Sequence, residues 1–259
     1  MPRAVYALKR EGTGDRVSVP VRKKRIVYPD SDGKPMADNT KQFNWIVRIK
    51  VGLEVLFADR ADVFVAGDLL WYPVEGDNKI RMAPDALVVF GRPKGDRGSY
   101  RQWEEGGTAP HTVFEILSPG NTKREMAHKL SFYEKYGVKE YYEYDPDRIV
   151  LKGWVRSGNR LEPIGNMQGW VSPGLGIRFE PDADDLHIFR PDGREILRPE
   201  EAEGRAEKAE KRAEKAEREK KQAEREKKQA EARAEKERQC AEMLSAKLRE
   251  LGINLTPGI

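Results

Sequence analysis

The last fifth of the chain has a composition that keeps it out of any hydrophobic core. Between residues 200 and 250 the sequence is almost entirely Glu, Lys, Arg, Ala and Gln. Such a segment buries too little apolar surface to fold as a compact unit. All five Trp and all nine Tyr precede it. The core must therefore form within the residues before 200, a length that suits one globular domain.

The charged segment has a spacing typical of a long helix. From Ala202 onward, alanines and then leucines recur at alternating steps of three and four residues, which predicts a coiled coil over residues 199–251 and a short tail over 252–259. Because most of this seam is alanine, only its last, leucine-containing part is expected to hold a partner firmly. A homo-oligomer through residues 202–251 is one expectation. A single solvated helix, stabilised by alanine propensity and ion pairs, is the other.

Net charge, cysteine content and hydropathy indicate which partners and which cellular compartment suit this protein. The formal net charge is +4, which permits a polyanionic partner but is weak support for one. Cys240 is the only cysteine, so one chain cannot form a disulfide. The sequence starts without a signal-peptide pattern and contains no apolar run near the ~18 residues of a membrane span. We expect a soluble, cytoplasmic protein that does not enter membranes.

The remaining sequence predicts a mixed α/β domain at residues 39–198, preceded by an extension at residues 1–38. The extension is polar and interrupted by Gly and Pro, with one edge strand expected at 17–21 or 25–28. The domain alternates helical and strand patterns, which predicts a mixed sheet flanked by helices. The expected elements are a helix from Asn39, strands Val63–Ala66, Ala86–Phe90, Thr112–Leu117 and Glu140–Tyr144, a helix from Asn121 or Thr122 to Tyr136, a hairpin of Ile149–Val155 with Leu161–Ile164, and closing strands within Trp170–Phe179 and at Leu186–Phe189.

Two carboxylates stand in or beside these apolar strands. Asp85 follows Pro84 and opens the run DALVVF, and Glu115 lies inside HTVFEIL. Burying an ionised carboxylate without a partner costs roughly several kcal/mol of folding free energy or more. Two acids on neighbouring strands also repel each other, so a shared cation is the simplest remedy. Oxygen ligands favour a hard ion such as Mg²⁺, or Mn²⁺.

Other groups complete a candidate site for phosphodiester hydrolysis. The backbone carbonyl of Ile116 is a further candidate ligand, and Asp68 is either a third acid or a turn residue. A lysine near the attacking water is also needed. Leu117 occupies the strand position where that lysine would share a face with Glu115, so Lys129 in the following helix is the candidate. Its plain alternative is a solvent-facing helix lysine.

Candidate DNA contacts lie in two places. The Gly-rich loop over residues 91–110 carries Arg97 and Arg101, along with two aromatic residues. Lys123 and Arg124 open the second helix, where helix N-termini attract anions. The three histidines show no zinc-ligand spacing.

Several motifs occur in order and at suitable spacing between Asn39 and Phe189. They are Pro84-Asp85, Glu115-Ile116-Leu117-Ser118-Pro119, Lys129, Tyr133, Tyr136-Gly137-Val138, Glu140-Tyr141-Tyr142 and Asp145-Pro146. Together they resemble the Uma-type (DUF820-like) endonuclease family of bacteria, which belongs to the PD-(D/E)XK nuclease superfamily with a restriction-endonuclease-like fold. The resemblance implies a metal-dependent DNA endonuclease with Asp85 and Glu115 as metal ligands, and a catalytic lysine moved from the strand to the helix at Lys129.

Two rival functions remain at this point. In the first, the nuclease-like domain is catalytically inactive and the long helix assembles an interaction protein. In the second, the domain binds DNA without cutting it, which the small net charge disfavours because tight non-specific binding needs several excess basic contacts.

Overall fold

The computed structural model describes residues 6–10, 16–20 and 26–250. The chain divides into two compact units, residues 1–199 and residues 200–259. Within the first unit, β1 (Tyr6–Arg10) and β2 (Arg16–Pro20) form an antiparallel hairpin. One of the two alternative edge strands is thus confirmed in part, and its partner β1 was not predicted. Residues 26–28 form no strand.

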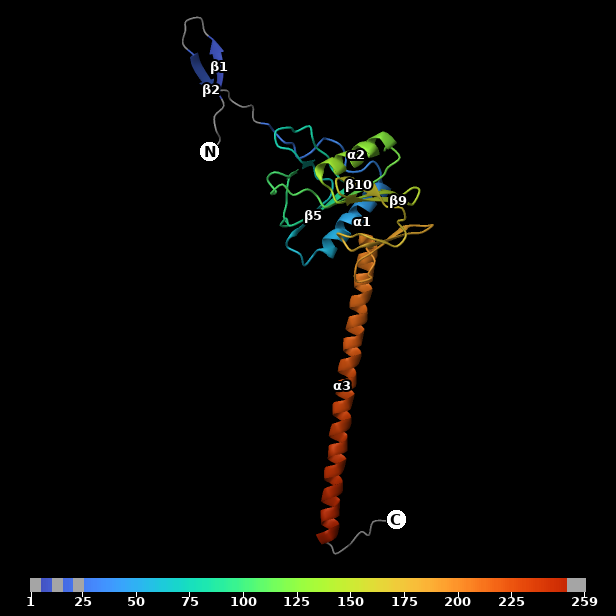
Figure 1. Ribbon diagram of the computed structural model, residues 1–259. Coiled ribbons are helices and arrows are strands. Elements are labelled where there is room, and N and C mark those ends of the chain that lie inside the picture. Colours follow the sequence, from blue (N-terminus) through green and yellow to red (C-terminus); the bar gives the residue numbers. More distant parts are fainter. Residues whose placement is uncertain (1–5, 11–15, 21–25, 251–259) are drawn as a thin grey trace. The chain divides into compact units, whose positions relative to one another are not determined.

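A six-stranded mixed sheet forms the centre of the first unit (Figure 1). Its strand order is β10-β9-β8-β7-β5-β3. Strands β7 and β8 pair in parallel, and every other neighbouring pair is antiparallel. The strands are β3 (Val63–Ala66), β5 (Ala86–Phe90), β7 (Thr112–Ile116), β8 (Glu140–Asp145), β9 (Val150–Ser157) and β10 (Arg160–Pro163).

Two helices cover opposite faces of this sheet, and their ends are set by local capping. Helix α1 (Thr40–Leu56) begins after Asn39, whose side chain accepts from the N–H of Gln42. Helix α2 (Lys123–Tyr136) begins after Thr122 and ends at Gly137, which is left-handed with φ of 95°. Both predicted helices are confirmed at these caps.

The two faces of the sheet bury separate hydrophobic cores. Alternate residues of β7 point to opposite faces. Phe114 and Ile116 pack with α1 in one core, whereas Val113 packs with Tyr133 of α2 in the other. Glu115 therefore projects toward α2, on the same face as Val113.

Smaller elements complete the unit. Strands β4 (Trp71–Tyr72) and β6 (Tyr100–Arg101) pair in parallel, so the long loop after β5 contains a short strand that was not predicted. Strands β11 (Trp170–Val171), β12 (Arg178–Pro181) and β13 (Leu186–Phe189) form an antiparallel sheet. The region Trp170–Phe179 is thus two short strands separated by a turn.

Residues 26–38 lie against the domain. The side-chain amide of Asn78 donates to the carbonyl of Val27, and the Tyr72 hydroxyl donates to the carbonyl of Pro29. Closer to the centre of the sheet, Ser118 Oγ donates to Asp38 at 2.5 Å. Residues on the N-terminal side of the expected boundary at residue 38, and Asp38 itself, are therefore hydrogen-bonded to the domain.

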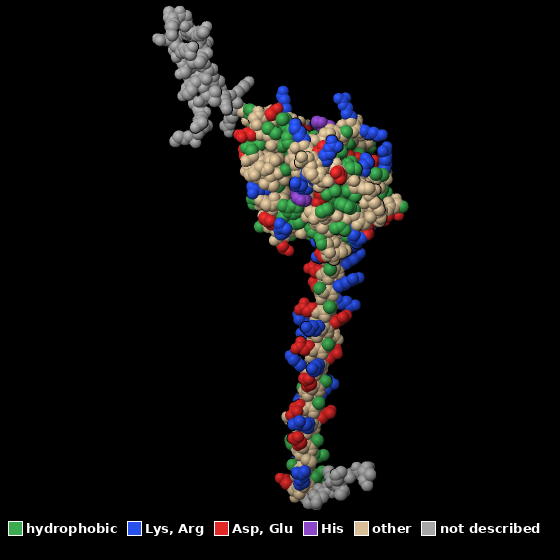
Figure 2. Space-filling view, viewed as in Figure 1, with side chains coloured by type: hydrophobic (Ala, Val, Ile, Leu, Met, Phe, Trp, Pro, Cys, Tyr) green, Lys and Arg blue, Asp and Glu red, His purple; other side chains and the backbone are tan. Residues whose placement is uncertain are grey.

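The second unit is dominated by one helix, α3 (Pro199–Glu250), of 52 residues. At 1.5 Å per residue its length is about 78 Å. Acidic and basic side chains alternate along it (Figure 2), and exposed i,i+4 pairs such as Lys221 with Glu217, at 2.6 Å, recur through it. In the described part of the chain, no helix has the length and apolar character needed to cross a membrane.

Candidate active site

The sheet brings Asp85 and Glu115 together at the centre of the domain. Asp85 directly precedes β5, Glu115 lies in β7, and these two strands are neighbours. The N–H of Ile116 donates to Oδ2 of Asp85 at 2.6 Å, which ties the first acid to the strand of the second. Both acids are buried, with 8% of Asp85 and 1% of Glu115 exposed.

Helix α2 supplies the partners of Glu115. The Lys129 ammonium donates to one carboxylate oxygen at 2.7 Å, and the Tyr133 hydroxyl donates to the other. Residues four apart lie on one face of a helix. The predicted pairing of Lys129 and Tyr133 on one face is therefore confirmed, and that face is turned to Glu115.

The electrostatics of the cluster follow from burial. Burial, followed by the charge of Glu115, holds the pKa of Asp85 well above its usual range. Burial also raises the pKa of Glu115, against the opposing charge of Lys129. Burial alone would lower the pKa of Lys129, but the charges of Glu115 and Asp85 outweigh it and raise that pKa. The lysine is thus ammonium at neutral pH, and the acids lack full charge compensation.

Asp68 lies at the edge of this cluster. It follows β3 in a left-handed backbone conformation, with φ of 49°, which Asp adopts more readily than most residues. Its N–H donates to the carbonyl of Pro84, so the turn is held beside Asp85. Burial and the charge of Asp32 raise the pKa of Asp68, and the charge of Lys129 opposes them.

Gln42 is a member of the site that sequence reasoning missed. This side chain of α1 is 6% exposed, and its amide donates to the carbonyl of Ile116 at 2.7 Å. Its oxygen accepts from the N–H of Asp38. The spacing of Asn39 and Gln42 carries the signal of a capping box, but the reach to Ile116 depends on how α1 packs on the sheet.

The donor set suits a hard divalent cation. Asp85, Glu115 and the Ile116 carbonyl offer only oxygen atoms, and one or two carboxylates with water are the usual Mg²⁺ ligands. Each carboxylate oxygen has two acceptor positions, and so does a carbonyl. The contacts of Glu115 with Lys129 and Tyr133 therefore leave acceptor positions free, as does the contact of Ile116 with Gln42. Among the described residues no group of three His, Cys, Asp or Glu side chains is placed as a metal site.

The predicted DNA-contact residues fall into two groups. Arg97 pairs with Glu105 at 2.6 Å, lies 3.9 Å from the centre of the Phe64 ring, and donates to the carbonyls of Pro93 and Gly95. Its contacts therefore hold the long loop in shape. Arg101 pairs with Glu104 in the same loop. Lys123 and Arg124 are exposed on the first turn of α2.

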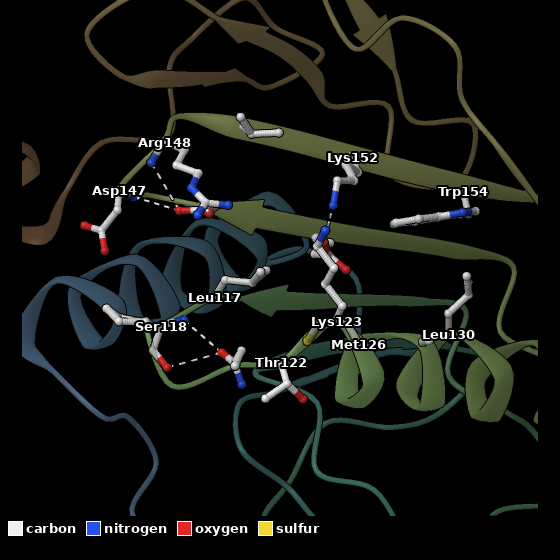
Figure 3. Close-up of a pocket in the computed structure, with 16 residues that line it drawn as sticks. Leu117, Ser118, Thr122, Lys123, Met126, Leu130, Asp147, Arg148, Lys152 and Trp154 are labelled. Atoms are coloured by element: carbon white, nitrogen blue, oxygen red, sulfur yellow. Dashed lines mark hydrogen bonds and ion pairs between the residues drawn. The ribbon is translucent and has the colours of Figure 1, made fainter.

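A cavity opens at the carboxyl ends of β7 and β8 (Figure 3), and neither Asp85 nor Glu115 is among its lining residues. Its volume is about 620 Å³, and its lining includes Leu117, Lys123, Glu143 and Lys152. Glu143 is the register partner of Glu115 on β8, and it accepts from Lys152 at 2.8 Å. Strand alternation puts Glu143 on the face of Tyr141, but only the pairing of β7 with β8 reveals that it neighbours Glu115.

Comparisons with known proteins agree with the motifs. The model of the Uma2 family, described as "Putative restriction endonuclease", matches residues 34–213. Among solved structures, a "putative nuclease belonging to DUF820" from Anabaena variabilis ATCC 29413 matches with 15% identity and a TM-score of 0.40, covering 59% of this chain and 78% of that chain. A comparison with curated proteins gives no match.

Proposed function

The chain belongs to the Uma2 family of restriction-endonuclease-type proteins, and from that premise we propose that it is a metal-dependent endonuclease that hydrolyses DNA phosphodiester bonds. The observation that carries the proposal is the cluster of Asp85, Glu115 and Lys129. Two buried acids face one ammonium group, and burial raises both of their pKa values, so ionising both acids is unfavourable without a second cation. A buried arrangement of this kind is typical of functional sites.

We assign the metal site to Asp85, Glu115 and the carbonyl of Ile116, with Asp68 near enough to add its charge. When bound, a divalent cation would withdraw charge from a phosphoryl oxygen and lower the pKa of a bound water. The cation would also offset the repulsion between the two acids. Gln42 fixes the direction of the Ile116 carbonyl, and Ile116 N–H fixes the carboxylate of Asp85.

Lys129 acts as a hydrogen-bond donor in this scheme. Its raised pKa keeps it protonated at neutral pH, so it cannot take a proton from water. The ammonium orients the attacking water and stabilises the charge that develops on the phosphoryl group. Tyr133 holds the other oxygen of Glu115, so the carboxylate cannot rotate away when Lys129 turns to the substrate.

A plasmid assay tests the proposal. Purified full-length protein is incubated with supercoiled plasmid in Mg²⁺, in Mn²⁺ and in EDTA, beside Glu115→Ala. We expect nicked or linear plasmid only with metal and only with the unmodified protein. Activity that persists in EDTA or in Glu115→Ala would contradict the assignment. Intact plasmid under every condition would favour the catalytically inactive interaction protein.

A further inference from the structure

The cavity of about 620 Å³ described above is lined by side chains of helix α2 on one side and of strands β8 and β9 on the other. On β9, the alternate residues Val150, Lys152 and Trp154 all face it. On α2, Lys123, Met126 and Leu130 face it from one side of the helix. Figure 3 shows Lys152 and Trp154 across the cavity from these three helical side chains.

Trp154 forms an aromatic wall of the cavity. Its ring stacks on Tyr141 of β8, with centroids 4.9 Å apart and an interplanar angle of 19°. Tyr141 is fully buried, so it supports one face of the indole and the side chain is held in place. A fixed indole at the edge of a cavity is a platform on which a nucleic-acid base can stack.

Charged groups lie next to this platform. Lys152 is 57% exposed although it pairs with Glu143, so its ammonium can still reach a phosphate. Among the residues that the structure describes, no carboxylate lies within ion-pair distance of Lys123. The buried carboxylate of Glu143 is 7% exposed and can accept from the amino group of a base. One nucleotide presents both kinds of partner, a phosphate and a base edge.

The size and position of the cavity fit an occupant of nucleotide size. A volume of about 620 Å³ lies in the range of small-ligand pockets. Glu143 sits one strand from Glu115, a spacing of about 4.8 Å. Because Glu143 lines the cavity, a nucleotide bound there would lie on the β8 side of Glu115, one strand away.

We propose that this cavity binds a single unpaired nucleotide of the substrate strand, stacked on Trp154 with its phosphate at Lys152 and Lys123. The inference rests on the proposed nuclease function and adds a substrate class to it. The preferred substrate is single-stranded or locally unpaired DNA beside the cut. Duplex DNA binds only after one nucleotide leaves the base stack.

Binding without cleavage tests the inference independently of activity. Full-length Asp85→Asn protein, in EDTA, is titrated with a labelled single-stranded oligodeoxynucleotide and with its blunt duplex, by fluorescence anisotropy. We expect tighter binding of the single strand. Adding Trp154→Ala should weaken single-strand binding by roughly tenfold or more, since a stacked base contributes that much, while Trp154→Phe keeps most of it.

A cavity-filling variant tests the pocket without removing a side chain that contributes to the fold. Ala127 is exposed and lines the cavity from α2, so Ala127→Phe fills the space without removing a core contact. Ser131→Phe, on the same helix but outside this cavity, is the matched control. We expect only Ala127→Phe to weaken single-strand binding, with both melting temperatures unchanged.

The outcomes separate this inference from the proposed function. Equal loss for single strand and duplex, or no loss in Ala127→Phe, overturns the nucleotide pocket even if the unmodified protein nicks plasmid. Selective loss of single-strand binding supports the pocket. If the unmodified protein then fails to cut plasmid with metal, the nuclease proposal fails and the pocket remains a nucleotide-binding site.

Discussion

At the scale of single residues, the site is defined by Asp85 and Glu115, two buried acids whose charged forms are disfavoured by burial. Asp85 could be predicted as a candidate site residue because a carboxylate beside the apolar run DALVVF is costly to bury without a partner. Gln42 could not, because nothing local distinguishes a glutamine that accepts from the N–H of Asp38 before the helix from one that also donates to the carbonyl of Ile116 in β7. The contacts of Asp68 with Pro84 and of Arg97 with Phe64 likewise join residues distant in sequence.

Replacing Asp85 should stabilise the metal-free protein. The folded-state pKa of Asp85 is raised, so the acid favours the fold below its unfolded pKa and loses that contribution as pH rises through its folded pKa. At neutral pH the charged form is therefore destabilising, and Asp85→Asn should raise the melting temperature in EDTA by about 2–4 °C per kcal/mol gained.

The gain from Asp85→Asn should shrink toward acid pH, where the aspartic acid is protonated too. Thermal unfolding by circular dichroism between acid and neutral pH checks this. Asp59→Asn, at an exposed position before β3, serves as the matched control. An Asp85→Asn protein that melts below the unmodified one at neutral pH would show that the carboxylate is compensated without metal.

Gln42 gives a second prediction at this scale. Gln42→Leu removes the amide that holds the Ile116 carbonyl, and changes behind metal ligands cost about 10–100-fold in metal affinity or activity. We expect plasmid nicking to need a correspondingly higher Mg²⁺ concentration. Gln168→Leu, at an exposed position, should leave the Mg²⁺ titration unchanged.

At the scale of elements, helix α2 brings the ammonium group of Lys129 to Glu115 of β7. The ends of this helix could be predicted to within a residue or so because Thr122, one of the two expected caps, and Gly137 are local caps. Strands β4 and β6 could not be predicted, since two-residue strands carry no periodicity and pair only through tertiary contacts. The prediction that Lys129 replaces a strand lysine depends on α2 docking with that side inward, and the contact with Glu115 is consistent with it.

The position of the lysine can be tested by moving it. Lys129→Met should lower the nicking rate by about 10²–10³-fold, the usual cost of removing one stabilising donor. Leu117 follows Glu115 by two residues, so Lys129→Met combined with Leu117→Lys should recover part of that loss. Nicking rates of the single and double variants provide the measurement. No recovery, with the fold intact, would mean that the helical origin of the lysine matters for its geometry.

At the scale of the whole molecule, the chain joins a sheet-centred unit to a long helix. The sequence favoured a long helix outside the core because residues 200–250 contain few large apolar side chains. The sequence left self-association open, because an alanine-rich, charged helix has the same composition whether it pairs with a second copy or stays single. Near its end α3 exposes Met243 and Leu244, which are 68% and 62% exposed. We propose that the full chain self-associates there, within residues 202–251.

Light scattering can decide between an oligomer and a free helix. Leu244→Lys with Leu248→Lys should reduce the mass of the full chain to that of a monomer, because charged residues in a helical seam oppose burial. Ala216→Lys, in the alanine part, should have a smaller effect. A monomeric unmodified chain would establish α3 as a solvated helix and remove the oligomer from the proposal.

The contact between Lys129 and Glu115 has a consequence for how a cell makes this protein. The acids and the lysine meet only after α2 has been synthesised and has docked on the sheet through Tyr133. A nascent chain that has emerged only as far as β7 holds the two acids without the ammonium group of Lys129. Under the proposed function, the complete site would therefore exist only once the domain has been made through α2.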